Sequence, residues 1–284
     1  MRKRFLSPRQ TRRDFLKKAA LTGLIASSPS LALAQNRKVQ TIGLQLYSLR
    51  AEMAEDFEGT LEQLAELGFK EMEFAGYHGK TPIEVRRILD SFGLVSPAAH
   101  IQLNAIRENL EREIETAATI GQQYIVVPSL PSNERSLSHY ERHADTLNTA
   151  GEKTKEANIQ VGYHNHSFEF EAQEQGKIGY DYLTDLTQED LVVFEMDLFW
   201  IVNAGHDPVT YFGQLPNRFP MLHVKDRNIG GEMVDVGRGV IDFAQIFSHV
   251  DTAGFKHYFI EHDYPTDGIN SIAFSYNTLN DIRF

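Results

Sequence analysis

The sequence contains no cysteine among its 284 residues. A disulfide scaffold, a thiolate metal site and a thiol nucleophile are therefore excluded. Long hydrophobic runs are also missing. The apolar stretch 19–26 is interrupted by Gly23 and is too short to cross a bilayer, and no later stretch is long enough. We therefore expect no stable membrane insertion of the mature chain.

Basic residues are scarce after the first 34 positions. Residues 1–34 hold eight of the 28 Lys and Arg residues but only one of the 39 acids, Asp14. The rest of the chain therefore has 20 basic against 38 acidic residues, a net charge of −18. A body this acidic repels the phosphate backbone of nucleic acids, so we expect no general nucleic-acid binding.

The first 34 residues are typical of an export signal. Arg12 and Arg13 precede Phe15-Leu16-Lys17, the apolar stretch and finally Ala32-Leu33-Ala34. These are the basic region, the short apolar region and the small-x-small cleavage site of a signal peptide. The paired arginines resemble a bacterial twin-arginine signal. We predict a signal peptide over 1–34, the twin-arginine export machinery as a partner and a periplasmic or exported protein. The alternative is a basic amphipathic helix that belongs to the fold.

After residue 39, short apolar runs alternate with longer helical patterns. The expected strands are 41–47, 71–75, 94–100, 124–127, 159–166, 191–197, 221–226 and 257–262. The expected helices are 57–67, 82–92, 104–120, 138–157, 180–186, 208–214, 242–253 and 267–282. Strand–helix alternation implies parallel pairing. Eight such units in about 245 residues match the size of a closed barrel.

The predicted fold class is therefore α/β, a (β/α)₈ TIM barrel formed by one domain over 39–284. An open doubly wound sheet is the alternative. It lacks support, because no G-x-G-x-x-G or G-x-x-x-x-G-K-[ST] motif follows any expected strand.

Polar residues gather where the expected strands end, and in a parallel barrel these ends open on one face. The polar ends are Gln45, Tyr47, Glu73, His100, His164-Asn165-His166, Glu195 with Asp197, His223 with Lys225-Asp226, and Glu261-His262-Asp263. Residues two apart in a strand point to the same side. Strands five to eight would thus each aim two polar groups into one enclosed space, at a high electrostatic cost.

A divalent cation would offset that cost. His164, Asp197, His223 and Glu261 come from four successive strands, and this mixture of ligands suits Mn²⁺, Zn²⁺, Co²⁺ or Fe²⁺ better than Ca²⁺. Taken one at a time, a histidine here is more often a packed, hydrogen-bonded residue, and a carboxylate is more often a helix cap. His164-Asn165-His166 also matches the letters of a nuclease motif, whose ββα context is absent.

Several motifs resemble the sugar phosphate isomerase/epimerase group of the xylose-isomerase-like TIM barrel superfamily. They are GLQLYSLR (43–50), YHNHSFEF (163–170), FEMDLFW (194–200), HVKD (223–226) and IEHD (260–263). The resemblance implies one divalent metal ion, Mn²⁺ first, held by a Glu, Asp, His, Glu set on strands five to eight. It also implies proton movement at carbons beside a sugar carbonyl.

One position departs from this pattern. Asp197, His223 and Glu261 match the second, third and fourth ligands, but His164 stands where the epimerases have glutamate. In those enzymes two metal-bound glutamates face each other, one removing a proton and the other returning it. A two-base epimerisation is therefore in doubt here, unless His166 or Glu169 supplies the second base.

The remaining candidates are assigned from their chemistry. Glu261 or His166 would be the general base, and Lys225 would stabilise an oxyanion unless it pairs with Asp226 or Glu195. The candidate substrate-binding residues are Glu169, Glu73, His100, Trp200 and Arg238. Trp200 could equally belong to the core, and Arg238 to the surface.

The first hypothesis is a metal-dependent sugar isomerase or epimerase that works through an enediolate and takes a small-molecule sugar as its substrate. Loss of a β-substituent from the same intermediate would instead give a lyase or hydratase acting on keto-sugars or keto-glycosides. The exported location favours that second outcome, since sugar phosphates are cytoplasmic. An abasic-site endonuclease and a non-catalytic sugar-binding barrel are further alternatives, the first opposed by the acidic body.

Overall fold

The strands form a closed ring in a computed structural model that describes residues 37–284. Neighbouring strands pair in parallel in the order β1-β10-β7-β6-β5-β4-β3-β2. Their bounds are β1 (Gly43–Gln45), β2 (Glu71–Phe74), β3 (Val95–His100), β4 (Tyr124–Val127), β5 (Gln160–His164), β6 (Val192–Asp197), β7 (Met221–Val224) and β10 (His257–Ile260). The predicted (β/α)₈ barrel is confirmed. The predicted signal peptide lies outside the described residues.

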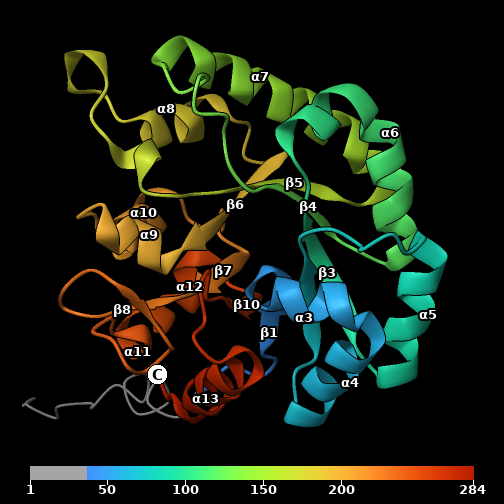
Figure 1. The fold of residues 1–284 in the computed structure, drawn as a ribbon. Coiled ribbons are helices and arrows are strands. Elements are labelled where there is room, and N and C mark those ends of the chain that lie inside the picture. The colour runs from blue at the N-terminus through green and yellow to red at the C-terminus, as the bar shows by residue number, and fades with distance from the viewer. Residues whose placement is uncertain (1–36) are drawn as a thin grey trace, which may run out of the picture. The chain divides into compact units, whose positions relative to one another are not determined.

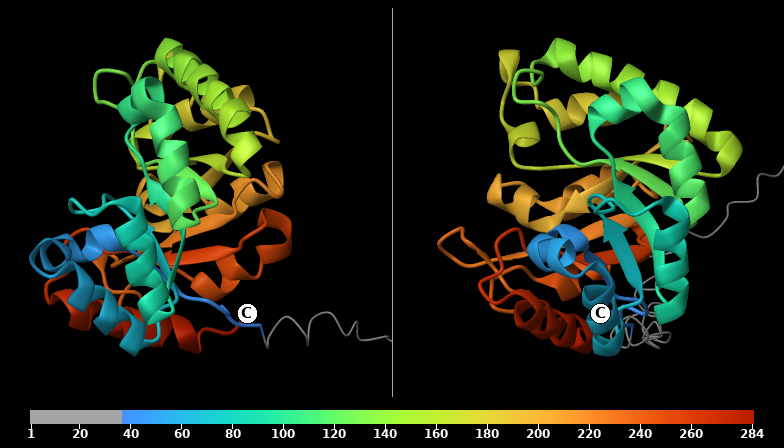
Figure 2. Two further views of the ribbon diagram at one scale, coloured as in Figure 1. Left: turned by 90° about the vertical axis from the view of Figure 1, so that its right-hand side faces the viewer. Right: turned by 45° about the vertical axis from the view of Figure 1, so that its right-hand side comes forward.

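The helices lie outside the ring of strands and follow one another in chain order (Figure 1). Figure 2 shows the same arrangement from two other sides. They are α4 (Phe57–Leu67), α5 (Pro82–Phe92), α6 (Leu103–Ile120), α7 (Leu137–Thr154), α8 (Gly179–Leu186), α10 (Pro208–Gln214), α11 (Phe243–Phe247), α12 (Val250–Ala253) and α13 (Gly268–Asp281). Among these helices, none is both long and apolar enough to cross a membrane.

Local sequence signals place the helix ends. Thr81 caps α5 in a capping box with Glu84, and Pro82 takes the first helical position. Gly68 and Gly93 end α4 and α5 in the left-handed conformation, at φ of 107° and 65°. A residue with a β-carbon adopts this conformation only at an energetic cost, so glycine is favoured there.

Several elements differ from the expectation in length or number. The Gln45 side chain caps the 3₁₀ helix η1 (Leu46–Leu49), so β1 is shorter than predicted, and α3 (Arg50–Glu55) follows it. Asp197 caps α9 (Leu198–Asn203) directly at the end of β6. The predicted helix 242–253 is split into α11 and α12. The other short elements are η2 (Lys155–Ala157), η3 (Phe168–Phe170), η4 (Glu174–Gly176), β8 (Asp226–Arg227) and β9 (Met233–Val234).

The barrel interior is layered. An apolar cluster fills its middle and consists of Ala98, Tyr124, Val126, Val193, Met221 and Phe259. Gly43 leaves the room that this layer needs, because a β-carbon there would lie 2.5 Å from Cδ1 of Phe259. Glu195 and His223 follow Val193 and Met221 of this layer by two residues, so they point to the same side of their strands. The apolar layer therefore closes the floor beneath a polar layer.

Asp226 organises the loop that follows β7. Its carboxylate is buried and accepts hydrogen bonds from four backbone N–H groups, those of Arg227, Gly237, Gly239 and Ile241. A carboxylate that satisfies several buried donors stabilises strongly, because each donor would otherwise be left without a partner. The short hairpin β8–β9 extends from this loop.

This arrangement makes a prediction about stability. Asp226→Ala leaves the four donors unpaired, so it is expected to lower the free energy of unfolding by about 3 kcal/mol or more. Asp207→Ala is the matched control, because exposed Asp207 caps α10 through one N–H and should cost about 1 kcal/mol. Urea denaturation measures both variants. Equal losses in the free energy of unfolding would show that Asp226 contributes no more to stability than an ordinary helix cap.

Candidate metal and sugar site

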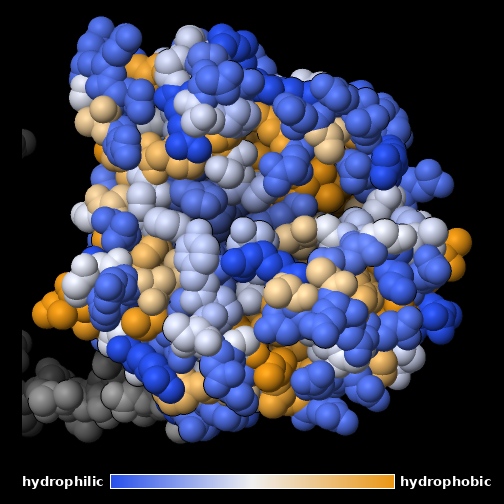
Figure 3. All heavy atoms as spheres, in the orientation of Figure 1, coloured by the Kyte–Doolittle hydropathy of each residue, from blue (hydrophilic) through white to orange (hydrophobic). Residues whose placement is uncertain are grey.

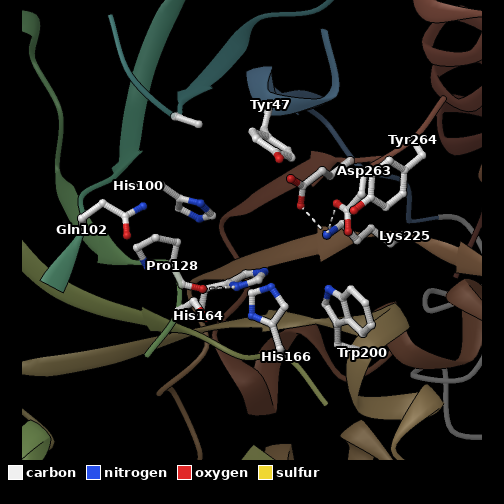
Figure 4. Close-up of a pocket in the computed structure, with 13 residues that line it drawn as sticks. Tyr47, His100, Gln102, Pro128, His164, His166, Trp200, Lys225, Asp263 and Tyr264 are labelled. Atoms are coloured by element: carbon white, nitrogen blue, oxygen red, sulfur yellow. Dashed lines mark hydrogen bonds and ion pairs between the residues drawn. The ribbon is translucent and has the colours of Figure 1, made fainter. Parts of the chain in front are cut away.

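A cavity of about 470 Å³ opens at the carboxyl ends of the barrel strands. The face seen in Figure 3 is mainly hydrophilic and is recessed near its middle. The lining residues include Tyr47, His100, Gln102, Pro128, Ser129, His164, His166, Trp200, Lys225, Glu261, Asp263 and Tyr264, most of them labelled in Figure 4. A pocket of this size holds a small molecule.

The four predicted metal ligands converge. One nitrogen or carboxylate oxygen from each of His164, Asp197, His223 and Glu261 lies within 4.8 Å of the others. Nε2 of His164 is 3.2 Å from Oδ2 of Asp197, and Nδ1 of His223 is 3.8 Å from the same oxygen and 2.7 Å from Oε2 of Glu261. All four side chains are buried.

The environment of His164 fixes which nitrogen is free. Its Nδ1 lies 3.0 Å from the carbonyl oxygen of Pro128, which can only accept, so Nδ1 carries the hydrogen. Burial and then the charge of His223 lower the pKa of His164, so the ring is neutral. The lone pair of Nε2 therefore faces the carboxylate of Asp197. A cation between these two atoms would accept the lone pairs of both.

Asp197 divides its two oxygens between two tasks. Oδ1 accepts the N–H of Trp200 and caps α9, and this leaves Oδ2 facing the cluster. Its backbone is also held: the side-chain amide of Asn165 donates to the carbonyl of Asp197 and accepts from its N–H. The ligand oxygen is thus positioned by both its own helix and the neighbouring strand.

A deeper group of polar side chains holds His223 from below. Nε2 of His223 lies 2.6 Å from Oε2 of Glu73 and 3.1 Å from Oε2 of Glu195. His100 contacts Glu195 at 2.8 Å, and Gln45 donates to Glu73. Glu73, His100, Glu195 and His223 also have metal-ligand spacing. Their ring nitrogens already contact these carboxylates, so we assign them as the outer partners that orient a ligating histidine.

Charge is shared within this deeper group. Burial, and then the neighbouring carboxylate of Glu195, raise the pKa of Glu73. Burial would also raise the pKa of Glu195, but His223 and His100 outweigh it and hold that pKa well below its usual range. Burial lowers the pKa of His223, yet the carboxylates around it raise the pKa well above its usual range. A cation bound at Nδ1 of His223 would therefore displace a proton.

Nδ1 of His223 and Oε2 of Glu261 lie 2.7 Å apart without the alignment of a hydrogen bond. The same oxygen of Glu261 contacts the ammonium of Lys225 at 2.6 Å. Burial would raise the pKa of Glu261, but Lys225 and then His223 hold it well below its usual range, so it is ionised. Two imidazole nitrogens and two carboxylate oxygens around one point fit a divalent transition-metal ion.

Lys225 lies at the upper edge of the cluster. Its Nζ is 3.0 Å from Oδ2 of Asp197, 2.6 Å from Oε2 of Glu261 and 2.9 Å from Oδ1 of Asp263 (Figure 4). Burial would lower the pKa of Lys225, but its three carboxylate partners raise it well above its usual range. The ammonium is therefore charged. The alternative partners considered from the sequence, Asp226 and Glu195, are not the ones it contacts.

His166 forms one wall of the cavity with aromatic neighbours. Its ring lies 5.3 Å from that of Trp200 and 5.9 Å from that of Phe168. Burial, followed by the nearby His164 and Lys225, lowers the pKa of His166 to about 3. The ring is therefore neutral at neutral pH. Its Nδ1 has no hydrogen-bond partner, and neither has Nε1 of Trp200.

Three of the predicted substrate-binding residues do not line the cavity. Glu73 is fully buried in the deeper group. Glu169 is also fully buried, where it accepts hydrogen bonds from the Tyr163 hydroxyl and the His166 N–H. Burial raises the pKa of Glu169 to about 7. Arg238 is exposed and pairs with Asp235. Their positions do not fit the expected contact with sugar, because buried or distant side chains cannot reach it.

Other lining residues were not identified as site residues from the sequence. Gln102, Ser129 and Tyr264 lie on loops that follow β3, β4 and β10, where strand periodicity gives no signal. The sequence predicts Asp263 and Tyr47 as polar strand ends, but it assigns neither of them to the site.

The chain is similar to several known proteins over most of its length. The family model described as "Xylose isomerase-like TIM barrel" matches residues 37–279. A sugar phosphate isomerase/epimerase from Parabacteroides distasonis is 28% identical with a TM-score of 0.73, and the match covers 84% of this chain and 92% of that one.

An inosose dehydratase from Lacticaseibacillus casei is 23% identical over 244 residues, which are 72% of this chain and 80% of the relative. The structure of an IOLI protein with a bound zinc atom shares the fold at 15% identity and a TM-score of 0.68, over 85% of this chain and 97% of that one.

The ligand set makes a prediction about metal content. The protein is expected to bind one divalent ion per chain, and His164→Asn should weaken that binding by about 100-fold or more, because even outer partners contribute about 10- to 100-fold. His78→Asn is the matched control, since His78 is exposed and tolerates asparagine at its positive φ of 49°. Equilibrium dialysis against Mn²⁺ and Zn²⁺ with elemental analysis measures this. Unchanged affinity in His164→Asn would remove His164 from the ligand set.

Proposed function

Since the chain belongs to the xylose isomerase-like TIM barrel family, we propose that it is a metal-dependent enzyme acting on an oxidised sugar. It would remove the proton on the carbon beside the sugar carbonyl and expel the substituent on the next carbon, as a dehydratase or lyase does. Similar proteins carry the names of sugar isomerases, epimerases and dehydratases. All these activities fit one shared step, loss of a proton beside a carbonyl.

The proposal rests on one observation: of the two carboxylates in the predicted metal cluster, one lines the cavity. Glu261 lines the cavity, whereas His164 occupies the position where a second glutamate would make a two-base pair. The Nδ1–H of His164 is held by Pro128, and Nε2 faces the cluster, so this ring has no nitrogen free to exchange a proton with substrate. Elimination needs one base and one proton donor, not two opposed bases.

The bound ion would be Mn²⁺ first, with Zn²⁺, Co²⁺ or Fe²⁺ as alternatives, and would supply Lewis-acid polarisation of the carbonyl oxygen. The chain supplies the proton movement. Glu261 is an ionised carboxylate and His166 is a neutral imidazole, and both side chains line the cavity, so either can accept a proton. The charged Lys225 can stabilise the developing oxyanion.

An isomerase or epimerase is the second candidate. His166 favours it, because its neutral imidazole also lines the cavity and could serve as a second base beside Glu261. The 28% identity to an isomerase/epimerase chain favours it too. An endonuclease is opposed by the net charge of −18 after residue 34, which repels the nucleic-acid backbone.

The reaction is tested in D₂O with metal-loaded protein and oxidised hexoses. Elimination should give an unsaturated ketone, detected by its ultraviolet absorbance. His166→Gln should keep its metal and lower kcat by about 100- to 10,000-fold if His166 is the base, whereas His78→Asn should not change kcat. Solvent deuterium in an intact sugar, without an unsaturated product, would overturn elimination in favour of isomerisation.

We also propose that the chain is exported through its twin-arginine segment. The support is the sequence Arg12-Arg13 ahead of an apolar stretch and Ala32-Leu33-Ala34. Replacing both arginines with lysine should leave the precursor in the cytoplasm of a bacterium with twin-arginine machinery, whereas Arg9→Lys should not. Cell fractionation and N-terminal sequencing measure this. Export of the doubly substituted protein would contradict the proposal.

A further inference from the structure

Two tyrosines stand at the rim of the cavity with unusually exposed rings. Tyr47 is 42% exposed and Tyr264 is 74% exposed, and both line the cavity. Figure 4 shows them on the side of the cavity opposite His166 and Trp200, with Asp263 between them. A large exposed aromatic side chain costs hydration free energy, so a rim that presents two of them calls for an explanation.

Arg50 fixes these two rings from one side. Its guanidinium carbon lies 4.4 Å from the ring centroid of Tyr47 and 5.7 Å from that of Tyr264. The same group donates to the backbone carbonyls of Tyr47 and Asp263, at 2.9 Å and 2.8 Å. Arg50 thus connects the segment after β1 to the segment after β10. It packs beside both rings without enclosing them.

The backbone under Tyr264 is anchored although the ring is exposed. The N–H of His262 donates to Ser48, the N–H of Asp263 to the sulfur of Met233, and the N–H of Tyr264 to Nδ1 of His262. A ring on a fixed backbone loses little freedom when a ligand stacks on it, so it binds at a low entropic cost. We call Tyr47, Arg50 and Tyr264 the rim clamp.

The opposite end of the cavity is polar and buried. The rings of His166 and Trp200 line this end, and Lys225 lies between this wall and the rim (Figure 4). Imidazole, indole and ammonium groups suit the hydroxyls and the face of the ring that reacts. Among the described residues that line the cavity, Lys225 is the one Lys or Arg, and three carboxylates already hold it. Lys225 is therefore not free to bind a phosphate group, and the guanidinium of Arg50 at the rim already donates to the backbone carbonyls of Tyr47 and Asp263.

From these features we infer that the rim clamp is a subsite for the leaving group, so that the substrate is an uncharged oxidised glycoside rather than a free sugar or a sugar phosphate. The inference rests on the proposed function. The oxidised ring binds at the buried end, beside the metal cluster. The second ring, a sugar or an aromatic aglycone, stacks on Tyr47 and Tyr264.

The step balances without a redox partner. The base takes the proton from the carbon beside the carbonyl, the electron pair of that C–H bond forms a carbon–carbon double bond, and the C–O bond to the aglycone breaks. The aglycone oxygen takes up one proton. The products are an unsaturated keto-sugar and an alcohol, which together contain all the atoms of the glycoside.

Binding tests the subsite without relying on turnover. Phenyl and methyl glucosides, in both anomeric forms and not oxidised, are titrated into metal-loaded protein by calorimetry. The better-binding phenyl anomer should bind about three- to tenfold more tightly than its methyl counterpart. Tyr264→Ala should abolish this difference, Tyr264→Phe should retain it, and Ile229→Ala is the control, because Ile229 is 92% exposed but lies outside the cavity lining.

The outcomes separate the subsite from the proposed function. Equal binding of phenyl and methyl glucosides by the unaltered protein, or a preference that survives Tyr264→Ala and Tyr47→Ala, would overturn the subsite even if oxidised monosaccharides react. A phenyl preference that depends on Tyr264, without turnover of any oxidised glycoside, would support the subsite while overturning the elimination reaction. Release of phenol from an oxidised phenyl glycoside, with a kcat/KM that Tyr264→Ala lowers several-fold, would support both the subsite and the elimination reaction.

Discussion

The structure depends on the electrostatic cost of burying four carboxylates in a closed barrel. Glu73, Glu195, Asp197 and Glu261 are all at most 5% exposed. Imidazoles and one ammonium offset part of this charge, and the raised pKa of Glu73 favours the neutral form of that carboxyl. The free nitrogen of His164 and the carboxylate of Asp197 face each other directly. A divalent cation at that point would neutralise the acids and accept both lone pairs.

The layers of the barrel decide from which side the metal cluster can be reached. The apolar layer below it leaves no polar surface for water, and the deeper group of Glu73, Glu195 and His100 holds His223 with Nδ1 toward the cluster. The cluster can therefore be reached from the mouth, where Glu261, Lys225 and His166 line the cavity. In the proposed binding mode, the oxidised ring would meet these buried polar groups and the leaving group would meet the rim, which would separate chemistry from specificity along the cavity.

The sequence predicts the barrel and the ligand quartet because both follow from periodicity. Strand–helix alternation sets the fold, and residues two apart at strand ends, such as His223 and Lys225, share a side. Periodicity does not reveal partners across the barrel. Glu169 has the chemistry to bind sugar, but only the path of the chain after β5 shows it buried against Tyr163. Tyr264 is likewise unremarkable in sequence, since its exposure depends on how Arg50 anchors a distant loop.

The central claim is that one cation is held by His164, Asp197, His223 and Glu261. A crystal structure of the Mn²⁺-loaded protein, with anomalous diffraction measured at the manganese edge, tests this most directly. The expected result is one anomalous peak about 2.0–2.3 Å from Nε2 of His164, Oδ2 of Asp197, Nδ1 of His223 and a carboxylate oxygen of Glu261. No peak at that point, or a peak confined to the protein surface, would contradict the account.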